Sequence, residues 1–532
     1  SGDIHAKEKL FLRGNTLKNS GTAAAGETDV AADTLENGGI LSGKTRVTVS
    51  TPQMDNRGGS IVSDEDVTIN TPELDNEQGH IASKGKLTLN VQEGSAINNK
   101  HGVLASEEDL KLDTVRLDNE GGNIHSGKTL RINTPALNNR GGSIDAAAHH
   151  LQGTSINNEN GHLIGRESLT LESDGEKLDN RGGQIISKGA LNIRAKNTGI
   201  DSSGGYIVGK NIAADVGSVS GGKIESWEEL TLRAKKAEKM ESVRSGGKMN
   251  IQTQDKYTMT GQYYSGGEAV IRATGGLEIA PEGKFEFNEN LKVTSDTHII
   301  NRGLLSSLGK ITVQAPEYIE NRDSGRIYGA HVAIGTNYFL NTGGAVVNAA
   351  KRADIGAETI KNDSGAHIES LGTINIGREL DGNGVAFGQA AHVINGRGTI
   401  DAGGDVNINS KKVDNFSEIR IEPISVSETP VEFYSSLLLP TEWIPTNRRR
   451  EYKLPLANNN KYTYTLAEME ERPVINNEGK IRAGGTLTFN SEDVYNEGQI
   501  AAGRIGGAGK NAINGGNMEG RRYTAAINGK IE

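Results

Sequence analysis

A short phrase returns along this chain at intervals of about 20 residues, and this repeat limits the available folds more than any other feature. A clear copy reads Leu-Asp-Asn-Arg-Gly-Gly-Gln-Ile over residues 178–185. A period of this length is typical of a solenoid, in which each repeat forms one turn and buries its apolar face only against its neighbours. The asparagine of the phrase falls at Asn37, Asn56, Asn76, Asn99, Asn119, Asn139, Asn158 and Asn180.

Apolar and polar residues alternate in short runs inside each repeat, for example at residues 87–89 and 191–193. This alternation is the period of a half-buried strand, and no repeat holds a convincing helical stretch. We therefore expect an all-β chain, folded as a parallel β-helix whose turns stack about 4.8 Å apart. Only 4% of the residues are aromatic, which fits a narrow interior filled by Ile, Leu, Val and Ala.

Glycine and asparagine are expected to form the corners between the strands. The Gly-Gly step supplies positive φ at a tight turn, and the eight asparagines are expected to stack as a structural ladder. The glycine corner is expected to continue where the asparagine is lost, in Ser-Gly-Gly copies that begin at Ser203, Ser220, Ser245 and Ser265. The asparagine returns in later copies, among them Asn301, Asn415, Asn476, Asn477 and Asn496.

Composition and charge exclude several classes of protein. The chain has 532 residues, a net charge of −10 and no cysteine. Disulfide frameworks and thiolate zinc sites need cysteine, and nucleic-acid binders normally show a basic face. No apolar run approaches the roughly 18 residues that a membrane-spanning helix needs. We therefore expect no nucleic-acid partner and no transmembrane segment.

Patterns that could carry chemistry are few and weak. His149 and His150 are adjacent, but neighbours on a strand point to opposite faces, so they are not expected to share a metal ion. The stretch 506–511 lacks the first Gly and the final Ser or Thr of a phosphate loop. Stacked turns could align Asp55 with Asp75 as a carboxylate pair, yet other copies place asparagine there. We predict no catalytic, cofactor-binding or metal-binding residue.

The repeat is interrupted at residues 422–473, which hold six of the eleven prolines. This divides the chain into a β-helix shaft over residues 1–421, an insert over 422–473 and continuing repeats over 474–532. Residues 451–454 and 461–466 are predicted to form a hairpin outside the β-helix, around a turn at 458–460.

The insert is also the strongest candidate for binding a partner, because Tyr, Trp and Arg dominate interface energetics. The candidate residues are Tyr434, Trp443, Arg448, Arg449, Arg450, Tyr452, Tyr462 and Tyr464. Two interpretations remain open. The insert either binds a partner, or packs on the rod and covers an apolar strip. The three arginines could meet an anionic glycan or form a solvated turn.

The phrase Leu-Asp-Asn-x-Gly-Gly-x-Ile-x-Ser, followed by a Leu-Thr-Leu strand, resembles the filamentous-haemagglutinin repeats of two-partner secretion exoproteins. The resemblance covers nearly the whole chain outside residues 422–473. It implies a right-handed parallel β-helix, exported through an outer-membrane two-partner transporter of a Gram-negative bacterium and displayed as a secreted or cell-surface shaft. We expect a non-enzymatic, monomeric rod that mediates adhesion through a receptor protein or glycan on a target cell.

Two alternatives stand beside the adhesin. Contact-dependent growth inhibition effectors use the same repeats as a stick for toxin delivery, and some parallel β-helices are polysaccharide lyases or hydrolases. The chain contains neither the Asn-Pro-Asn motif of the amino-terminal secretion domain nor the Val-Glu-Asn-Asn motif that precedes a toxin domain. Together with the opening Ser1-Gly2, this leads us to expect a piece of a longer protein.

Overall fold

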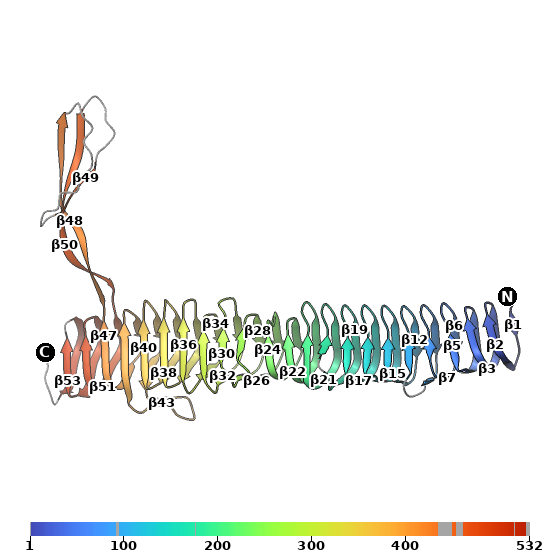
Figure 1. Ribbon diagram of the computed structural model, residues 1–532. Coiled ribbons are helices and arrows are strands. Elements are labelled where there is room, and N and C mark those ends of the chain that lie inside the picture. The colour runs from blue at the N-terminus through green and yellow to red at the C-terminus, as the bar shows by residue number, and fades with distance from the viewer. Residues whose placement is uncertain are drawn as a thin grey trace.

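The computed structural model describes residues 2–91, 95–175, 177–434, 449–453, 461–514 and 516–527, of which 419–477 and 522–527 are described by their backbone alone. Figure 1 shows a long rod with a slender sheet rising from its flank near the C-terminal end. The described chain contains strands and no helix, and about 23 turns follow each other about 20 residues apart. The predicted all-β parallel solenoid is confirmed.

A typical turn of the rod holds three short strands. One turn consists of β6 (Ser60–Ser63), β7 (Asp66–Thr71) and β8 (Leu74–Asp75), and the next of β9 (His80–Ser83), β10 (Leu87–Val91) and β11 (Ala96–Asn98). Each strand pairs in parallel with its counterpart one turn away, so that Ile61 lies beside Ile81 and Val67 beside Leu87. Because a slip by one residue would turn every apolar side chain outward, the repeat itself fixes the register.

Inward side chains form one continuous core along the rod. Ile61, Ile81, Leu104 and Ile124 follow each other in a single column and are fully buried. Burying one Ile or Leu contributes about 1.5–3 kcal/mol. Since each turn covers the next, this gain depends on stacking and not on any turn alone.

The two glycines of the phrase meet different requirements. The first has positive φ, 66° at Gly58, but Gln78, His101 and Asn160 adopt 53° to 56° at the same place, so glycine is favoured there and not required. The second lies against the neighbouring turn, where an added Cβ would collide with a backbone carbonyl oxygen. Glycine is kept at this second place in Gly59, Gly79, Gly102, Gly122, Gly142, Gly161 and Gly183.

The predicted Ser-Gly-Gly corner is correct for two copies and wrong for two. Gly205 and Gly222 lie at the asparagine corner, against the preceding turn. Ser245 and Ser265 instead pair in one column with Ser226, which ends β23 (Lys223–Ser226) and belongs to the corner after the first strand of the turn. Both corners need a tight turn after a small polar residue, so the tripeptide does not distinguish them.

Two segments leave the rod at its corners. The flap, residues 378–389, contains β43 (Glu379–Leu380) and β44 (Ala386–Phe387), which pair antiparallel. The second segment is a three-stranded antiparallel sheet of β48 (Glu418–Tyr434), β49 (Arg449–Lys453) and β50 (Lys461–Asn477), in the order β48-β50-β49. The predicted hairpin corresponds to β49 and β50, while β48 is an additional long strand.

The β48–β50 sheet stands in place of two residues of one asparagine corner. Asn415, in β47 (Val406–Phe416), donates to Asn496 of β51 (Lys480–Asn496), and Gly479 occupies the place of the second glycine. Residues 416–478 therefore stand where another turn has only Arg57 and Gly58. Arg57 and Gly58 face solvent, so a long insertion at this place leaves the stack intact.

The prediction that Asn476 and Asn477 begin a further copy of the phrase is wrong. Asn477 pairs with Glu418 at the foot of the sheet. The asparagine column continues directly from Asn415 to Asn496 and includes neither Asn476 nor Asn477. Of this phrase-like sequence, only Gly479 lies at the corner, in the place of the second glycine.

Candidate functional site

The eight predicted asparagines lie in one buried column along the first half of the rod. Each side-chain amide donates to the side-chain oxygen of the asparagine one turn later, at 2.7 or 2.8 Å from Asn37 to Asn180. Most of these amides also donate to a backbone oxygen of their own corner, such as Asn119 to Gly122. Asn19 extends the column at one end, and Ser202 accepts from Asn180 at the other.

A second column fills the same corner in the last part of the rod. It runs through Asn301, Asn321, Asn341, Asn362, Asn395, Asn415, Asn496 and Asn514, with N–O distances of 2.6 to 2.8 Å. Between the two columns, Met259 and Ile279 are buried in register with Asn301. These amides are structural, since their donors and acceptors are used within the stack.

The residue before most of these asparagines, either Asp or Asn, caps its own turn. Asp55 accepts from the backbone N–H of Arg57 at 2.9 Å, and Asp179 accepts from that of Arg181 at 3.2 Å. The arginine side chains bond the same carboxylates and lower the pKa of both. Asp55 and Asp75 do stack, in register. An ionised turn cap accounts for Asp55, whereas a general acid would need a raised pKa.

The side chains of the two adjacent histidines point to opposite faces of their strand, as neighbouring strand residues do. Both lie in β17 (Ser143–Gly153), where His149 is buried between Leu130 and Leu169 while His150 faces outward. Neither ring nitrogen of His149 makes a well-formed hydrogen bond, although the backbone of Ile164 lies close. Burial lowers the pKa of His149 to about 4. Within the described residues no group of three or more His, Cys, Asp or Glu is placed to hold a metal ion.

The β48–β50 sheet brings six of the eight candidate binding residues into one unit. Tyr434 ends β48, and the backbone registers are Tyr462 with Phe433, Tyr464 with Val431, and Tyr452 with Leu466. Arg449 and Arg450 belong to β49, opposite Met469 and Glu468 of β50. Trp443 and Arg448 lie outside the described residues.

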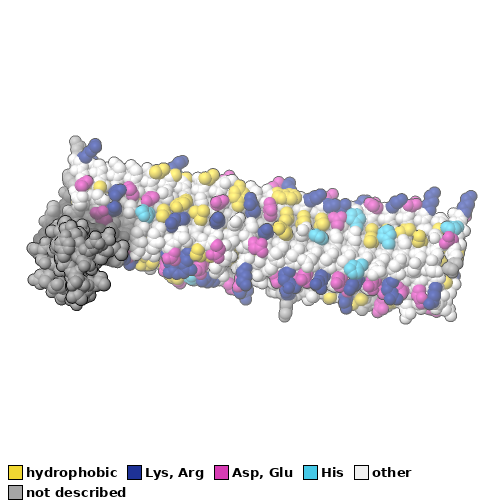
Figure 2. Space-filling model, turned by 90° about the horizontal axis from the view of Figure 1, so that it is seen from above, with side chains coloured by type: hydrophobic (Ala, Val, Ile, Leu, Met, Phe, Trp, Pro, Cys, Tyr) yellow, Lys and Arg dark blue, Asp and Glu magenta, His cyan; other side chains and the backbone are white. Residues whose placement is uncertain are grey.

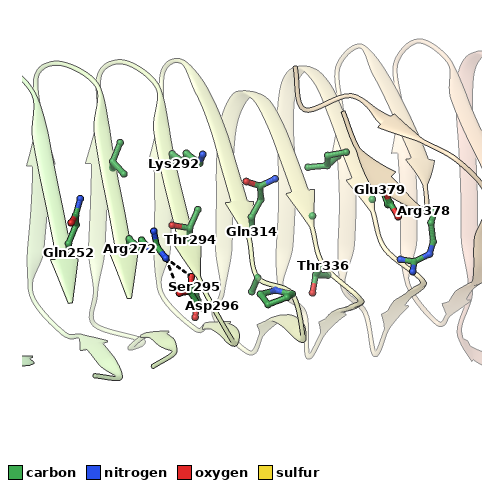
Figure 3. Close-up of a pocket in the computed structure, with 16 residues that line it drawn as sticks. Gln252, Arg272, Lys292, Thr294, Ser295, Asp296, Gln314, Thr336, Arg378 and Glu379 are labelled. Atoms are coloured by element: carbon green, nitrogen blue, oxygen red, sulfur yellow. Dashed lines mark hydrogen bonds and ion pairs between the residues drawn. The ribbon is translucent and has the colours of Figure 1, made fainter. Parts of the chain in front are cut away.

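Sequence reasoning missed a groove of about 700 Å³ beside the flap. Figure 3 shows its floor, where successive turns present Gln252, Arg272, Thr294 and Gln314, and its wall, formed by the flap. The unusual step of 33 residues from Asn362 to Asn395 was the signal that could have located the flap.

The flap backbone lies directly against glycines of the rod, and the buried carboxylate of Asp354 accepts a hydrogen bond from it. A Cβ at Gly356 would collide with the backbone of Glu379, and one at Gly377 with that of Phe387. Asp354, only 1% exposed, accepts from the Ala386 N–H at 3.1 Å. It also accepts from Arg352 Nε at 2.6 Å and Asn375 Nδ2 at 2.9 Å. Lys310 donates to the Asn383 carbonyl from the rod.

Charged side chains are distributed unevenly over the rod. Figure 2 shows acidic and basic side chains alternating along one edge of the N-terminal half. The pair of Lys84 with Asp64 is more than half-exposed, and such a pair contributes about 0–1 kcal/mol. This edge is a solvated surface whose charges largely cancel.

Comparison with known proteins identifies the repeat. A family model described as the haemagglutinin repeat matches residues 23–91, 90–182, 141–235 and 456–529, more than half of the chain. No curated protein and no solved structure matches the chain. The family is a structural, adhesin-type family whose members are typically secreted or surface-displayed. No helix in the described residues is long and apolar enough to span a membrane.

The first three matches cover the turns with the buried asparagine column from Asn37 to Asn180, and the last match includes β50 and the turns that follow it. The chain therefore belongs to the haemagglutinin repeat family and is a filamentous-haemagglutinin-like repeat region.

Proposed function

We propose that this chain is the shaft of an exoprotein displayed on the surface of a Gram-negative bacterium, and that the β48–β50 sheet contacts a receptor protein on another cell. Export would use an outer-membrane two-partner transporter, in keeping with the repeat type. The observation that carries the proposal is the sheet's position, raised from the flank of a long, regular rod (Figure 1).

The rod suits mechanical reach. Successive turns are joined by parallel backbone pairing on three strands, and the inward and corner side chains stack without a break from Leu41 to Val413. Such a structure resists bending because any bend would open the same core on one side. The sheet adds an element outside this regular scaffold, where loops and insertions commonly carry binding function.

The test is a deletion designed on the corner itself. Replacing residues 416–478 with Arg-Gly recreates the sequence Asn-Arg-Gly-Gly found at Asn56. We expect the variant to keep the circular dichroism and monomeric size of the parent chain and to lose binding to target cells in a panel of bacterial and mammalian cells. Unchanged binding by a folded variant would refute the assignment to the sheet.

A second deletion supplies the matched control. Removing residues 379–387 takes away both strands of the flap, which also leaves the rod at a corner in the C-terminal half, and cell binding should persist. The growth-inhibition alternative shares the shaft and the receptor contact. It differs in predicting that bound target cells stop dividing when exposed to producer cells in co-culture, whereas the adhesin predicts attachment without that effect.

A further inference from the structure

We propose that the groove beside the flap binds a neutral oligosaccharide that lies along the axis of the rod. The groove is separate from the β48–β50 sheet, so this site does not depend on the proposed receptor contact. Its volume of about 700 Å³ falls within the range of small-ligand sites.

A row of polar side chains forms the floor. Gln252, Arg272, Thr294 and Gln314 occupy equivalent outward places on β26 (Met249–Thr253), β29 (Ala269–Ala273), β32 (Leu291–Ser295) and β35 (Lys310–Gln314). Consecutive members are about 4.8 Å apart along the axis, close to the length of one sugar ring. The row ends at Gly335, where Leu380 of the flap contacts the sheet and forms a wall.

The wall distinguishes this groove from the rest of the rod. The same row continues through earlier turns, with Gln152 and Glu172 at equivalent places, but no flap stands beside it there. Polar residues alone therefore form an open surface. Polar residues next to the flap form a concave site that can exclude water from two sides of a ligand (Figure 3).

The charges in the groove favour an uncharged ligand. Arg272 is paired with Asp296 at 2.9 Å, and Arg378 is paired with Glu358. Lys292 and Glu379 add one charge of each sign. A charged ligand would meet opposing fields, whereas sugar hydroxyls, which both donate and accept, match the guanidinium, carboxylate and amide groups present.

Apolar groups complete the match. Val270, 38% exposed, lines the groove together with Pro316 and Leu380. These side chains can cover the C–H faces of sugar rings while the polar row meets their hydroxyl edges. Carbohydrates combine both kinds of surface within each residue.

A peptide fits the groove less well. The floor strands β29 and β32 are hydrogen-bonded to neighbouring turns on both sides. They therefore offer no free edge to which an extended peptide could add as a strand. The groove can recognise a ligand only through side chains, which suits a molecule rich in hydroxyl groups.

The experiment presents the 532-residue chain to an array of neutral oligosaccharides, acidic glycans and peptides, and then measures affinity for the strongest neutral oligosaccharide by calorimetry. We expect binding to a neutral oligosaccharide, with longer chains binding better than the disaccharide. Gln314→Trp fills the groove and should weaken binding at least about tenfold. Gln152→Trp changes the same row away from the flap and should leave the affinity unchanged.

Deleting residues 379–387 gives an independent test of the wall. Circular dichroism should show that the solenoid remains folded, while oligosaccharide binding should be lost. The proposal is overturned if no neutral oligosaccharide binds, if only acidic glycans or peptides bind, or if Gln314→Trp binds as well as the parent chain. Loss of cell binding on deleting the β48–β50 sheet would be a separate result, since that deletion leaves the groove in place.

Discussion

Between Asn37 and Asn180 the corner of every turn is closed by a buried asparagine amide, whereas in the turns of Met259 and Ile279 the same corner is closed by apolar side chains. The backbone keeps its parallel pairing through both regions. The corner therefore needs a side chain that fills the space, and it can be filled by an amide column or by hydrophobic packing.

The two solutions differ in what they require of their neighbours. Each amide in the column is both donor and acceptor, so removing one leaves groups unpaired on two turns. Met259 and Ile279 need only complementary volume. Aligned amides also polarise one another, which strengthens a long column more than an isolated bond. The amide region is thus the more specific of the two and the more sensitive to single substitutions.

The largest expected effect comes from breaking the column. Asn119→Leu removes the acceptor of Asn99 and the donor to Asn139, and it leaves the Gly122 carbonyl without its side-chain partner. Buried unpaired polar groups cost about 1–3 kcal/mol each, so we expect a local loss of about 3 kcal/mol. Hydrogen exchange followed by mass spectrometry should show faster opening of the turns on both sides of Asn119.

Met259→Leu is the matched change in the apolar region. It conserves volume and breaks no hydrogen bond, and such swaps usually cost less than about 1.5 kcal/mol. Exchange in its turns should change little. Equal losses for the two variants would show that the amide column contributes no more than packing.

Acidification should lower the stability of the region between Asn37 and Asn180 more than that of the apolar region around Met259 and Ile279. Burial holds the folded pKa of His149 at about 4, below its ordinary value of 6.5. Below pH 6.5 the unfolded chain therefore binds a proton that the folded chain rejects, and stability falls as the pH drops toward 4. The loss at pH 5 is about 2 kcal/mol. Hydrogen exchange in β17, compared at pH 7 and pH 5 after correction for the intrinsic rate, measures it.

His149→Leu is the control for that titration. Leucine matches Leu130 and Leu169 in the same column. The variant should be as stable at pH 5 as at pH 7 in this region. In the apolar region around Met259 the fully buried titratable side chains include Tyr257 and Tyr263, and burial raises the pKa of both hydroxyls, so they stay neutral between pH 5 and pH 7. A pH dependence that survives His149→Leu would assign the effect to another group.

The architecture was predictable because its determinants are local and repeated. The spacing of the asparagines and the alternation at residues 87–89 gave the period and the strands. The corner assignment of Ser245 and Ser265 was wrong because Ser-Gly-Gly suits either corner. The choice depends on which strand follows, and a single tripeptide does not carry that information.

The groove could not be predicted, for a physical reason. It depends on Gly335, Gly356 and Gly377 lying in one outward column, which gives the flap room to rest on the sheet. These glycines are about 20 residues apart, and glycine is common in the chain. Only the stacked register shows that they are neighbours. That the candidate residues of the insert bind a partner stays a prediction, because the structure describes residues 419–477 by their backbone alone.

The smallest expected effect tests whether a polar pair in the apolar region is essential. The hydroxyl oxygens of Tyr257 and Tyr263 lie 2.5 Å apart in the core, and the Tyr263 ring stacks on Phe285. Tyr263→Phe leaves the Tyr257 hydroxyl without its hydrogen-bond partner and should lower the free energy of unfolding by about 1 kcal/mol. Changing both tyrosines to phenylalanine removes donor and acceptor together, so the double variant should be closer to the parent chain than the single one. If hydrogen exchange in β27 (Tyr257–Met259) and β28 (Gln262–Ser265) instead shows additive losses, each hydroxyl has a further role, and the apolar region depends on polar contacts as the amide column does.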